Sequence, residues 1–463
     1  MEALNDLKPA DMNPVGRARC LPGTRVQVLL DLFLALTHPN PKNKIIWLCG
    51  PAGSGKSTIL NTLAHYIGKL GRQGAFLFFD QTDRDNSDPR RVILTLAHQL
   101  ARFHPIFAEK FVSQIQTWPG ITESSLDAQF QRLIQDPLTA IAKTDGWGPI
   151  IIVLDALDEC GTTVSREPLF KALLNLTKLP NMFRLLIASR DEPKRTLSRN
   201  VKKPSTSANN GKSSDIELLR LALADVTVYP IGNEPPLSDI NLLFRRWVAR
   251  NSDVFVNRGL PPDWPGGRII EQLVALSRGL FIWASTAIRF IESDFPEEKL
   301  KAVLIASAHG MSHIGLDGLY QVILTHQFDS YNANELEVAH SILGAIAVSG
   351  KRLTDQQLSR LLGLAVGRVQ DVLLRLHPVL LWAHRRPVQV LHSSFIDFLC
   401  DPKRCQDPQW QINVSAPDLA SISRRSTITS GRESMEFSFG PQPTIDVRNS
   451  PSWVVSLNKG RCS

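Results

Sequence analysis

The sequence has no hydrophobic run long enough to cross a bilayer. Such a span needs roughly 18 uninterrupted apolar residues, and the most apolar long segment, residues 273–291, is broken by Arg278 and Arg289. The first residues, MEALNDLKPADMNP, also lack the apolar centre of a signal peptide. We therefore expect a cytoplasmic protein with no membrane partner.

Paired cysteines and internal repeats are missing as well. The six cysteines are scattered without any CxxC pair, which argues against a zinc site or a disulfide framework and for a reducing compartment. The lack of a repeat excludes a solenoid or propeller within this sequence. A net charge of +8 over 463 residues is small, so it gives little support to nucleic-acid binding. The length predicts about three domains.

One stretch, KNKIIWLCGPAGSGKSTIL, stands out against these absences. Its apolar run Ile45–Cys49 predicts a buried strand. The next eight residues, Gly50–Ser57, fit the phosphate-binding pattern GxxxxGK[ST] at every fixed position. The residues that follow place apolar side chains at helical spacing, which predicts a helix packed on a core. A strand, a glycine loop and a helix in this order predict a nucleotide-binding site.

Each residue type in this loop has a physical role. Gly50, Gly53 and Gly55 allow the backbone to turn its N–H groups inward around phosphate oxygens. Lys56 supplies a full positive charge for the β- and γ-phosphates, and the Ser57 hydroxyl is suited to ligate Mg²⁺. The predicted nucleotide-binding residues of the loop are Gly50, Pro51, Ala52, Gly53, Ser54, Gly55, Lys56, Ser57 and Thr58.

A second apolar strand is predicted at residues 150–154, and it ends in an acidic cluster. An apolar strand that ends in an aspartate, after a phosphate loop, is the pattern that holds Mg²⁺ in ATPases. Asp155 is the predicted metal residue, together with Ser57. Asp158 and Glu159 lie just beyond, where a carboxylate can orient or deprotonate an attacking water. The alternative is a solvated acidic turn or a helix cap.

Three more strands are predicted, at residues 75–79, 183–188 and 225–229. The strand at 183–188 runs into Arg190. A cation at the carboxyl end of a strand in an open α/β sheet lies in the ligand crevice, so Arg190 is a candidate sensor of the γ-phosphate. A surface ion pair is the alternative. Together these elements predict an α/β P-loop NTPase domain, a parallel sheet with helices on both faces.

From residue 238 the pattern changes to helices without strands. After these helices come two short apolar runs, 379–382 and 388–391, which are joined by a turn that contains Arg385 and Arg386 and predict a small β-hairpin. A further helix is predicted at 395–399. This order predicts an all-α helical domain followed by a winged-helix domain. His392 lies just before the last helix, with Ser393 or Ser394 available as its cap. An isolated histidine is more often a packed or surface residue than a ligand contact.

We divide the chain on these patterns. The expected units are a flexible lead-in at 1–20, a nucleotide-binding domain at 21–230 with a disordered loop at about 194–214, a helical domain at 231–308, a winged-helix domain at 309–402, and a mostly disordered tail at 403–463.

Five motifs together, GPAGSGKST, IIIVLDALDEC, LLIASRDEP, RGLFIWAST and LHSSFIDFLCDPKRC, occur in an order that resembles the fungal NACHT-domain proteins. These belong to the STAND class of P-loop NTPases and are related to NOD-like receptors. The resemblance runs from about residue 20 to about residue 407. It implies ATP or ADP with Mg²⁺ as cofactors and a winged-helix histidine, here His392, on the ADP phosphate. It also implies a resting state closed over ADP, and opening with homo-oligomer formation on exchange for ATP.

Two features depart from the family pattern. Relatives carry a Gly-x-Pro whose proline packs on adenine, and here Gly279-Leu280-Phe281 places a phenylalanine there. Relatives also continue into sensor repeats, which are not found here.

The leading interpretation is a slow ATPase that serves as a signalling switch, in innate-immunity-like or self/non-self signalling, with an unknown protein partner and without nucleic acid. The alternatives are an inert truncated scaffold, a DNA-binding winged-helix protein and a small-molecule kinase. The kinase would need a basic lid and an acceptor pocket, which the sequence does not indicate.

Overall fold

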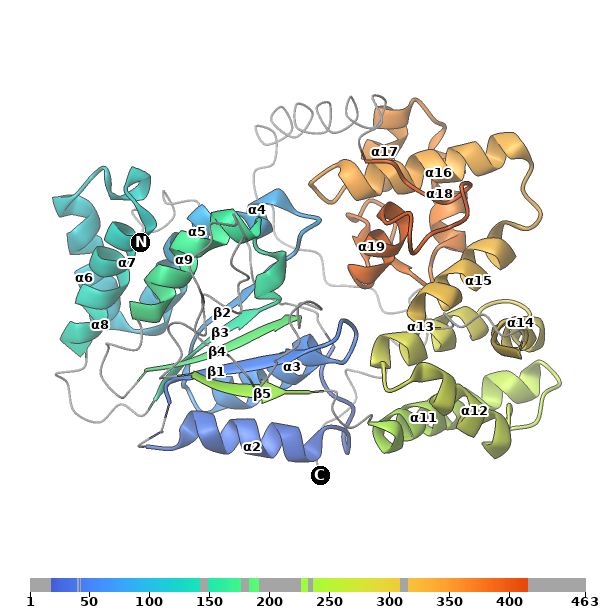
Figure 1. Cartoon of the computed structure of the whole chain (residues 1–463), viewed down its shortest axis with the longest axis horizontal. Helices are drawn as coiled ribbons and strands as arrows, with labels where there is room; N and C mark the ends of the chain where they lie inside the picture. Colours follow the sequence, from blue (N-terminus) through green and yellow to red (C-terminus); the bar gives the residue numbers. More distant parts are fainter. Residues whose placement is uncertain are drawn as a thin grey trace, which may run out of the picture.

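The computed structural model describes residues 18–39, 41, 43–141, 149–175, 183–190, 226–231, 236–308 and 315–414. Residues 1–17 of the lead-in predicted at 1–20, the predicted loop at about 194–214 and the last 49 residues, 415–463, lie outside this description. Figure 1 shows an α/β half on one side and a helical half on the other. None of the helices in the described part is long and apolar enough to cross a membrane.

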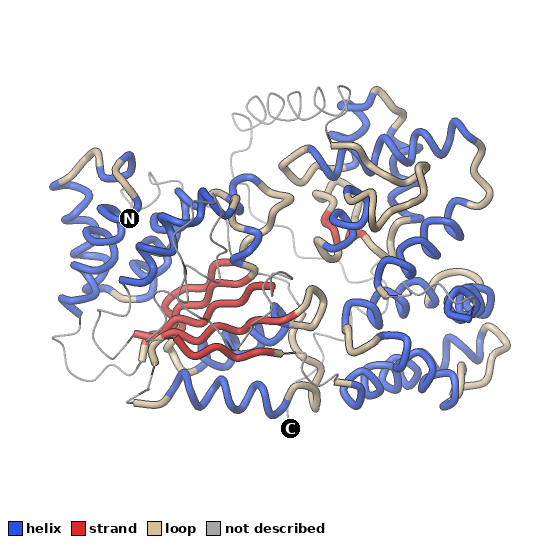
Figure 2. The backbone as a smooth tube through the Cα atoms, in the orientation of Figure 1, coloured by secondary structure: helices blue, strands red, loops and turns tan. Residues whose placement is uncertain are grey.

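The α/β half is built on a five-stranded sheet with the order β2-β3-β4-β1-β5, drawn in red in Figure 2. All of its strand pairs are parallel. The strands are β1 (Ile45–Gly50), β2 (Gln73–Phe78), β3 (Ile150–Asp155), β4 (Phe183–Arg190) and β5 (Val226–Pro230). The five predicted strands are confirmed, with ends shifted by one or two residues. Their apolar runs were readable because β1 and β3 are buried on both faces.

Helices cover both faces of this sheet. On one face α2 (Val26–Thr37) and α3 (Lys56–Lys69) share a core with the sheet through residues such as Leu36, Leu60 and Ile67. The other face packs against a second core. Its helices are α5 (Pro89–Phe103), α6 (Pro105–Thr117), α7 (Leu126–Phe130), α8 (Asp136–Ile141) and α9 (Thr163–Leu174), with the short α4 (Arg84–Ser87) at its edge. The predicted fold class of this half is confirmed.

The helical half begins with four helices and continues into a winged helix. The first four are α11 (Leu237–Asn257), α12 (Gly267–Ser277), α13 (Phe281–Ile291) and α14 (Pro296–Ala308). The winged-helix part comprises α15 (Leu316–Phe328), α16 (Ala333–Val348), α17 (Asp355–Leu362), α18 (Val366–Arg375), the antiparallel pair β6 (Leu380–Leu381) and β7 (Gln389–Val390), and α19 (Ser394–Cys400). The predicted order of helices, hairpin and helix is confirmed.

A single hydrophobic core joins the two parts of the helical half. It runs from Ile240 on α11 to Ile412, without a break between α14 and α15. Packed residues also continue beyond 402, where we expected a tail to begin. Trp410 is 1% exposed, and its ring centre lies 5.1 Å from that of Phe328 in a tilted arrangement. The predicted start of the tail at 403 is therefore wrong for these residues, whose apolar side chains are spaced too irregularly to indicate a helix or a strand.

Candidate functional site

The phosphate loop lies between the end of β1 and the start of α3, as the motif predicted. Gly53 and Gly55 have φ values of +78° and +93°, a region that side chains disfavour. A Cβ on Gly50 would come 2.4 Å from the carbonyl oxygen of Ile231, so only glycine fits there. The loop therefore has the backbone shape that directs N–H groups inward at a helix N-terminus.

The helical half packs directly on this loop. The Ile282 N–H donates to the Gly53 carbonyl at 3.2 Å, and a Cβ on Gly53 would overlap the Ile282 side chain. Arg25, just before α2, donates to the Ser54 carbonyl at 2.8 Å and lies 5.1 Å from the Phe281 ring centre. Phe281, which replaces the proline of the Gly-x-Pro pattern, is thus engaged by Arg25.

Lys56, Ser57 and Asp155 lie together at the mouth of the loop. Lys56 Nζ donates to the carbonyl oxygens of Gly50 at 2.7 Å and Pro51 at 3.0 Å. Ser57 Oγ donates to Asp155 Oδ1 at 3.1 Å, and Asp155 is almost completely buried. Because Mg²⁺ in such sites takes one or two protein oxygens plus phosphates and waters, this hydroxyl–carboxylate pair fits the ion.

Ser54 gives a second indication that an anion fits the loop. Its Oγ is buried and has no hydrogen-bond partner within the described residues. Buried polar atoms are nearly always satisfied by protein, water or a ligand. A phosphate oxygen in the loop would supply the missing partner.

The acidic cluster after β3 surrounds Arg190 at the end of β4. Ala156 adopts a left-handed conformation, φ 57°, which turns the chain so that Asp158 and Glu159 face β4. Arg190 pairs with Asp158 at 3.1 Å and with Glu159 at 3.0 Å. The predicted acidic residues and the predicted sensor are therefore in direct contact, and the ion pair weighed as an alternative for Arg190 is present.

Burial raises the pKa of Glu159 to about 7, with a smaller contribution from the Asp158 charge. Arg190 and the Ser393 hydroxyl oppose this shift. Several carboxylates crowd one guanidinium, which raises the pKa of Arg190 further above its ordinary value despite its burial. A carboxyl that titrates near neutral pH is suited to general acid–base chemistry.

The winged helix reaches the same arginine from the other side. Arg190 pairs with Asp397 of α19 at 2.6 Å and bonds to Ser393. Ser393 Oγ also donates to Glu159 at 2.8 Å, and Gln81 donates to Asp397 at 3.2 Å. We call the set Gln81, Glu159, Arg190, Ser393 and Asp397 the interdomain latch. A further ion pair, between Asp80 and Arg352, lies beside it.

The predicted serine cap of α19 is confirmed in position but not in its capping bond. Ser393 is the N-cap residue but makes no capping bond, because its hydroxyl is used by the latch. Ser394 Oγ bonds to Tyr320 at 2.8 Å and to His392 Nδ1 at 2.7 Å. His392 thus supports the first turn of α19.

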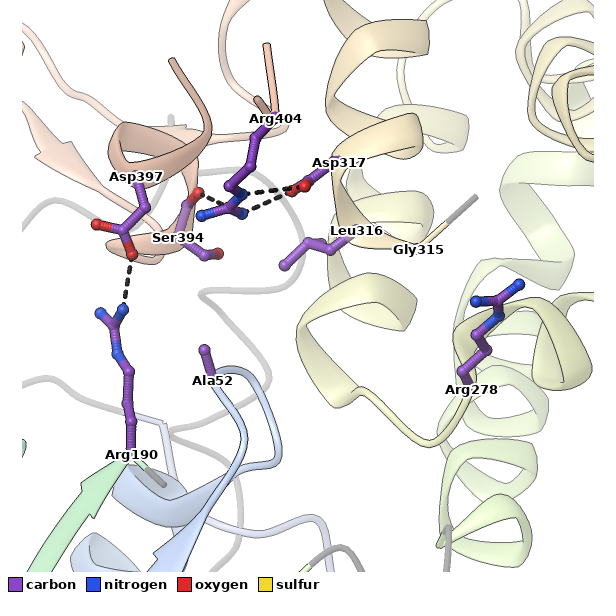
Figure 3. A pocket seen from close by; sticks show the side chains of 9 residues that line it. All are labelled: Ala52, Arg190, Arg278, Gly315, Leu316, Asp317, Ser394, Asp397 and Arg404. Carbon is purple, nitrogen blue, oxygen red and sulfur yellow. Dashed lines mark hydrogen bonds and ion pairs between the residues drawn. The ribbon is translucent and has the colours of Figure 1, made fainter. Parts of the chain in front are cut away.

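A cavity of about 380 Å³ lies between the phosphate loop and the helical half; we call it the junction cavity. It is lined by Ala52, Arg190, Arg278, Gly315, Leu316, Asp317, Ser394, Asp397 and Arg404. Figure 3 shows Ala52 and Arg190 on one side, with Asp397 and Arg404 opposite them. Of the predicted site residues, only Ala52 and Arg190 belong to this lining.

Sequence reasoning missed four polar residues near the site. Ser393, Asp397, Arg404 and Arg278 all lie in motifs that the sequence displays, RGLFIWAST and LHSSFIDFLCDPKRC. Ser393 and Asp397 contact Arg190 of the α/β half, which is more than 200 residues away in the sequence. Arg278 and Arg404 line the junction cavity together with residues of the α/β half. No local spacing pattern encodes such a contact.

The glycine loop, the parallel sheet and the acidic strand define a P-loop NTPase fold. In agreement, a family model described as Nephrocystin 3, N-terminal matches residues 30–190, which run from α2 through β4. No curated protein matches the sequence.

Several solved structures align with this chain at low sequence identity. A Walker-type ATPase of Pyrococcus abyssi is 13% identical, with 82% of this chain and 98% of that chain covered and a TM-score of 0.38. Cdc6p from Pyrobaculum aerophilum is 12% identical, with 91% of this chain and 97% of that chain covered and a TM-score of 0.33. AMPPCP-bound DnaA from Aquifex aeolicus is 11% identical, with 90% of this chain and 99% of that chain covered and a TM-score of 0.33.

Proposed function

We propose that this protein is a nucleotide-controlled signalling switch that binds ATP or ADP with Mg²⁺ and hydrolyses ATP slowly. The observation that carries the proposal is the position of Arg190. One guanidinium contacts both the acidic residues expected to act on ATP and the winged-helix residues Ser393 and Asp397. A group shared in this way links the nucleotide site to domain closure.

The proposed roles follow from the geometry. Lys56 turns from the Gly50 and Pro51 carbonyls to the β- and γ-phosphates, and Ser57 and Asp155 hold the metal, which supplies charge neutralisation for the phosphates when bound. Glu159, with its raised pKa, accepts a proton from the attacking water, and Asp158 orients it. His392 contributes to ADP retention through the start of α19.

Arg190 sets the conformational preference. While it pairs with Asp397, the winged helix stays on the α/β half, and a γ-phosphate within reach of the guanidinium competes for the same N–H groups. ATP and ADP therefore favour different states, which is the requirement for a ligand to shift a conformational equilibrium. We assign residues 21–230 to the nucleotide-binding domain, 231–308 to the helical domain and 309 onward to the winged helix. Opening exposes surface for a homo-oligomer or for a protein partner in the cytoplasm.

The test is the identity and amount of nucleotide released when freshly purified protein is denatured. Near one ADP per chain in the wild type, and none in Lys56→Ala, supports a closed switch. An empty site that turns over added ATP rapidly favours an ordinary enzyme such as a small-molecule kinase. A site that binds no nucleotide contradicts the proposal and favours an inert scaffold.

A further inference from the structure

We propose that the junction cavity binds a phosphoryl group and that Arg278 is the residue that holds it. This inference rests on the proposed function and adds a binding residue to it. The phosphoryl group has two possible sources with the same chemistry: the terminal phosphate of a bound nucleoside triphosphate, or free orthophosphate.

The place of the cavity makes it reachable from the nucleotide site. Ala52, at the tip of the phosphate loop, forms part of its lining, and Arg190 of β4 forms another part. At about 30 Å³ of liquid volume per water, the cavity of about 380 Å³ has room for a tetrahedral anion and part of its hydration shell. A phosphoryl group that extends past the loop, or leaves it, enters this space.

The charges in the lining single out Arg278. Arg404 is held by Asp317 through two bonds of 2.6 and 3.0 Å, and Arg190 is held by the latch. Arg278 has no hydrogen bond or ion pair from its guanidinium to any residue in the described part of the chain. Of the three arginines around the cavity, it is therefore the one whose donors are available to a ligand. A planar guanidinium with several N–H donors matches a phosphate in two-point contacts.

The backbone conformation at the end of α12 fixes the position of Arg278 beside the cavity. It ends α12 in a left-handed conformation, φ 49°, where glycine is the usual residue. Gly279 and Leu280 then lead into α13, whose Ile282 N–H bonds to Gly53 of the phosphate loop. Arg278 is thus four residues from a direct contact with the loop, and a change in the loop is transmitted to its position.

The aspartates in the lining give the binding a consequence. Asp317 and Asp397 repel an anion that enters the cavity, while Arg404 and Arg190 attract it. A phosphoryl group on Arg278 therefore weakens the Arg190–Asp397 and Arg404–Asp317 ion pairs. Because the Arg190–Asp397 pair belongs to the interdomain latch, the latch is weakened as well.

The test compares wild type with Arg278→Gln and with a matched control, Arg268→Gln. Arg268 is an exposed arginine on the same helix and does not line the cavity. Calorimetric titrations with Mg²⁺ use three probes: ADP, the non-hydrolysable analogue AMPPCP, and orthophosphate added to protein saturated with ADP. Thermal melting of the three proteins checks that all are folded.

We expect Arg278→Gln to weaken AMPPCP or orthophosphate about tenfold, the loss of one charge-assisted contact. Its affinity for ADP should stay within twofold of wild type, and Arg268→Gln should match wild type for all three probes. Loss with AMPPCP alone identifies the nucleotide's own terminal phosphate as the ligand. Loss with orthophosphate alone identifies the free ion. Loss with both shows that the site accepts either.

Three results would overturn the inference: no change beyond twofold for AMPPCP and orthophosphate, an equal loss for ADP, or the same losses in Arg268→Gln. If wild type binds no nucleotide, the proposed function fails separately. Orthophosphate is then titrated into nucleotide-free protein. Binding that Arg278→Gln abolishes keeps the cavity site, and no binding refutes it.

Discussion

At the scale of single residues, Lys56 is the one on which we expect the proposed nucleotide binding to depend most. Its ammonium group bonds to the carbonyl oxygens of Gly50, in a partly buried contact, and of Pro51, in an exposed one. Lys56→Ala should therefore lower the affinity for ADP and ATP at least about a hundredfold with a melting temperature close to wild type. Calorimetric titration measures the affinity.

Lys69→Ala, at the other end of the same helix, is the matched control and should bind normally. Full affinity in Lys56→Ala would remove the phosphate-loop assignment.

Glu159 predicts a dependence of stability on pH. Because burial raises its folded-state pKa from 4.5 to about 7, the folded state binds its proton more tightly than the unfolded state does. The free energy of unfolding therefore falls as pH rises from about 4.5 to about 7 and changes no further above that. The contribution is on the order of 1–3 kcal/mol.

Glu159→Gln removes this titration, so the difference in unfolding free energy between pH 5 and pH 8 should shrink in denaturant titrations. Glu123→Gln, an exposed carboxyl in the same half, should keep the wild-type difference. Identical pH profiles in wild type and Glu159→Gln would show that Glu159 does not titrate in this range.

Local sequence patterns could predict which residues belong to the candidate site, but not which residues they contact. Lys56, Ser57 and Asp155 follow from a fixed motif, and the structure places them together. Ser393 also stands at the expected helix start, yet its hydroxyl bonds to Glu159, 234 positions away. Contacts of that separation are decided by how domains pack, which one sequence does not display.

At the scale of elements, the strands and most helices were predictable because burial imposes a period on the sequence. The apolar runs of β1 and β3 and the three-to-four-residue spacing of the buried apolar residues in α18 leave clear signals. The order of strands in the sheet and the docking of α19 left none, since they depend on long-range contacts.

Helix α19 is held on the α/β half by a few polar contacts, which predicts the effect of Asp397→Asn. The substitution removes the charge that pairs with Arg190 in a partly buried setting. We expect amide hydrogens of α19 and of the end of β4 to exchange about ten times faster, since a charged hydrogen bond contributes about 1.5–3 kcal/mol. Hydrogen-exchange mass spectrometry reads out both segments.

Asp329→Asn, an exposed aspartate after α15, is the control for charge removal in the same half. Unchanged exchange in Asp397→Asn would mean that the neighbouring contacts hold the winged helix without it.

At the scale of the whole molecule, the shared core of the helical half predicts that its two parts unfold together. Trp410 lies at the far end of that core, and Trp410→Ala should cost about 3–5 kcal/mol and lower a single melting transition for residues 237–412. Trp118→Ala, whose side chain is 46% exposed, should cost at most about 1 kcal/mol. Two separate transitions in the helical half would contradict the single core.

That core also has a mechanical consequence. Ile282, which bonds to the phosphate loop, and Asp397, which pairs with Arg190, lie on helices that share one hydrophobic core, and both join the helical half to the α/β half. Because the core between these two contacts is continuous, we expect a displacement at one of them to be felt at the other. In the proposed switch, a change of nucleotide and a force on the winged helix should then favour the same movement of the helical half.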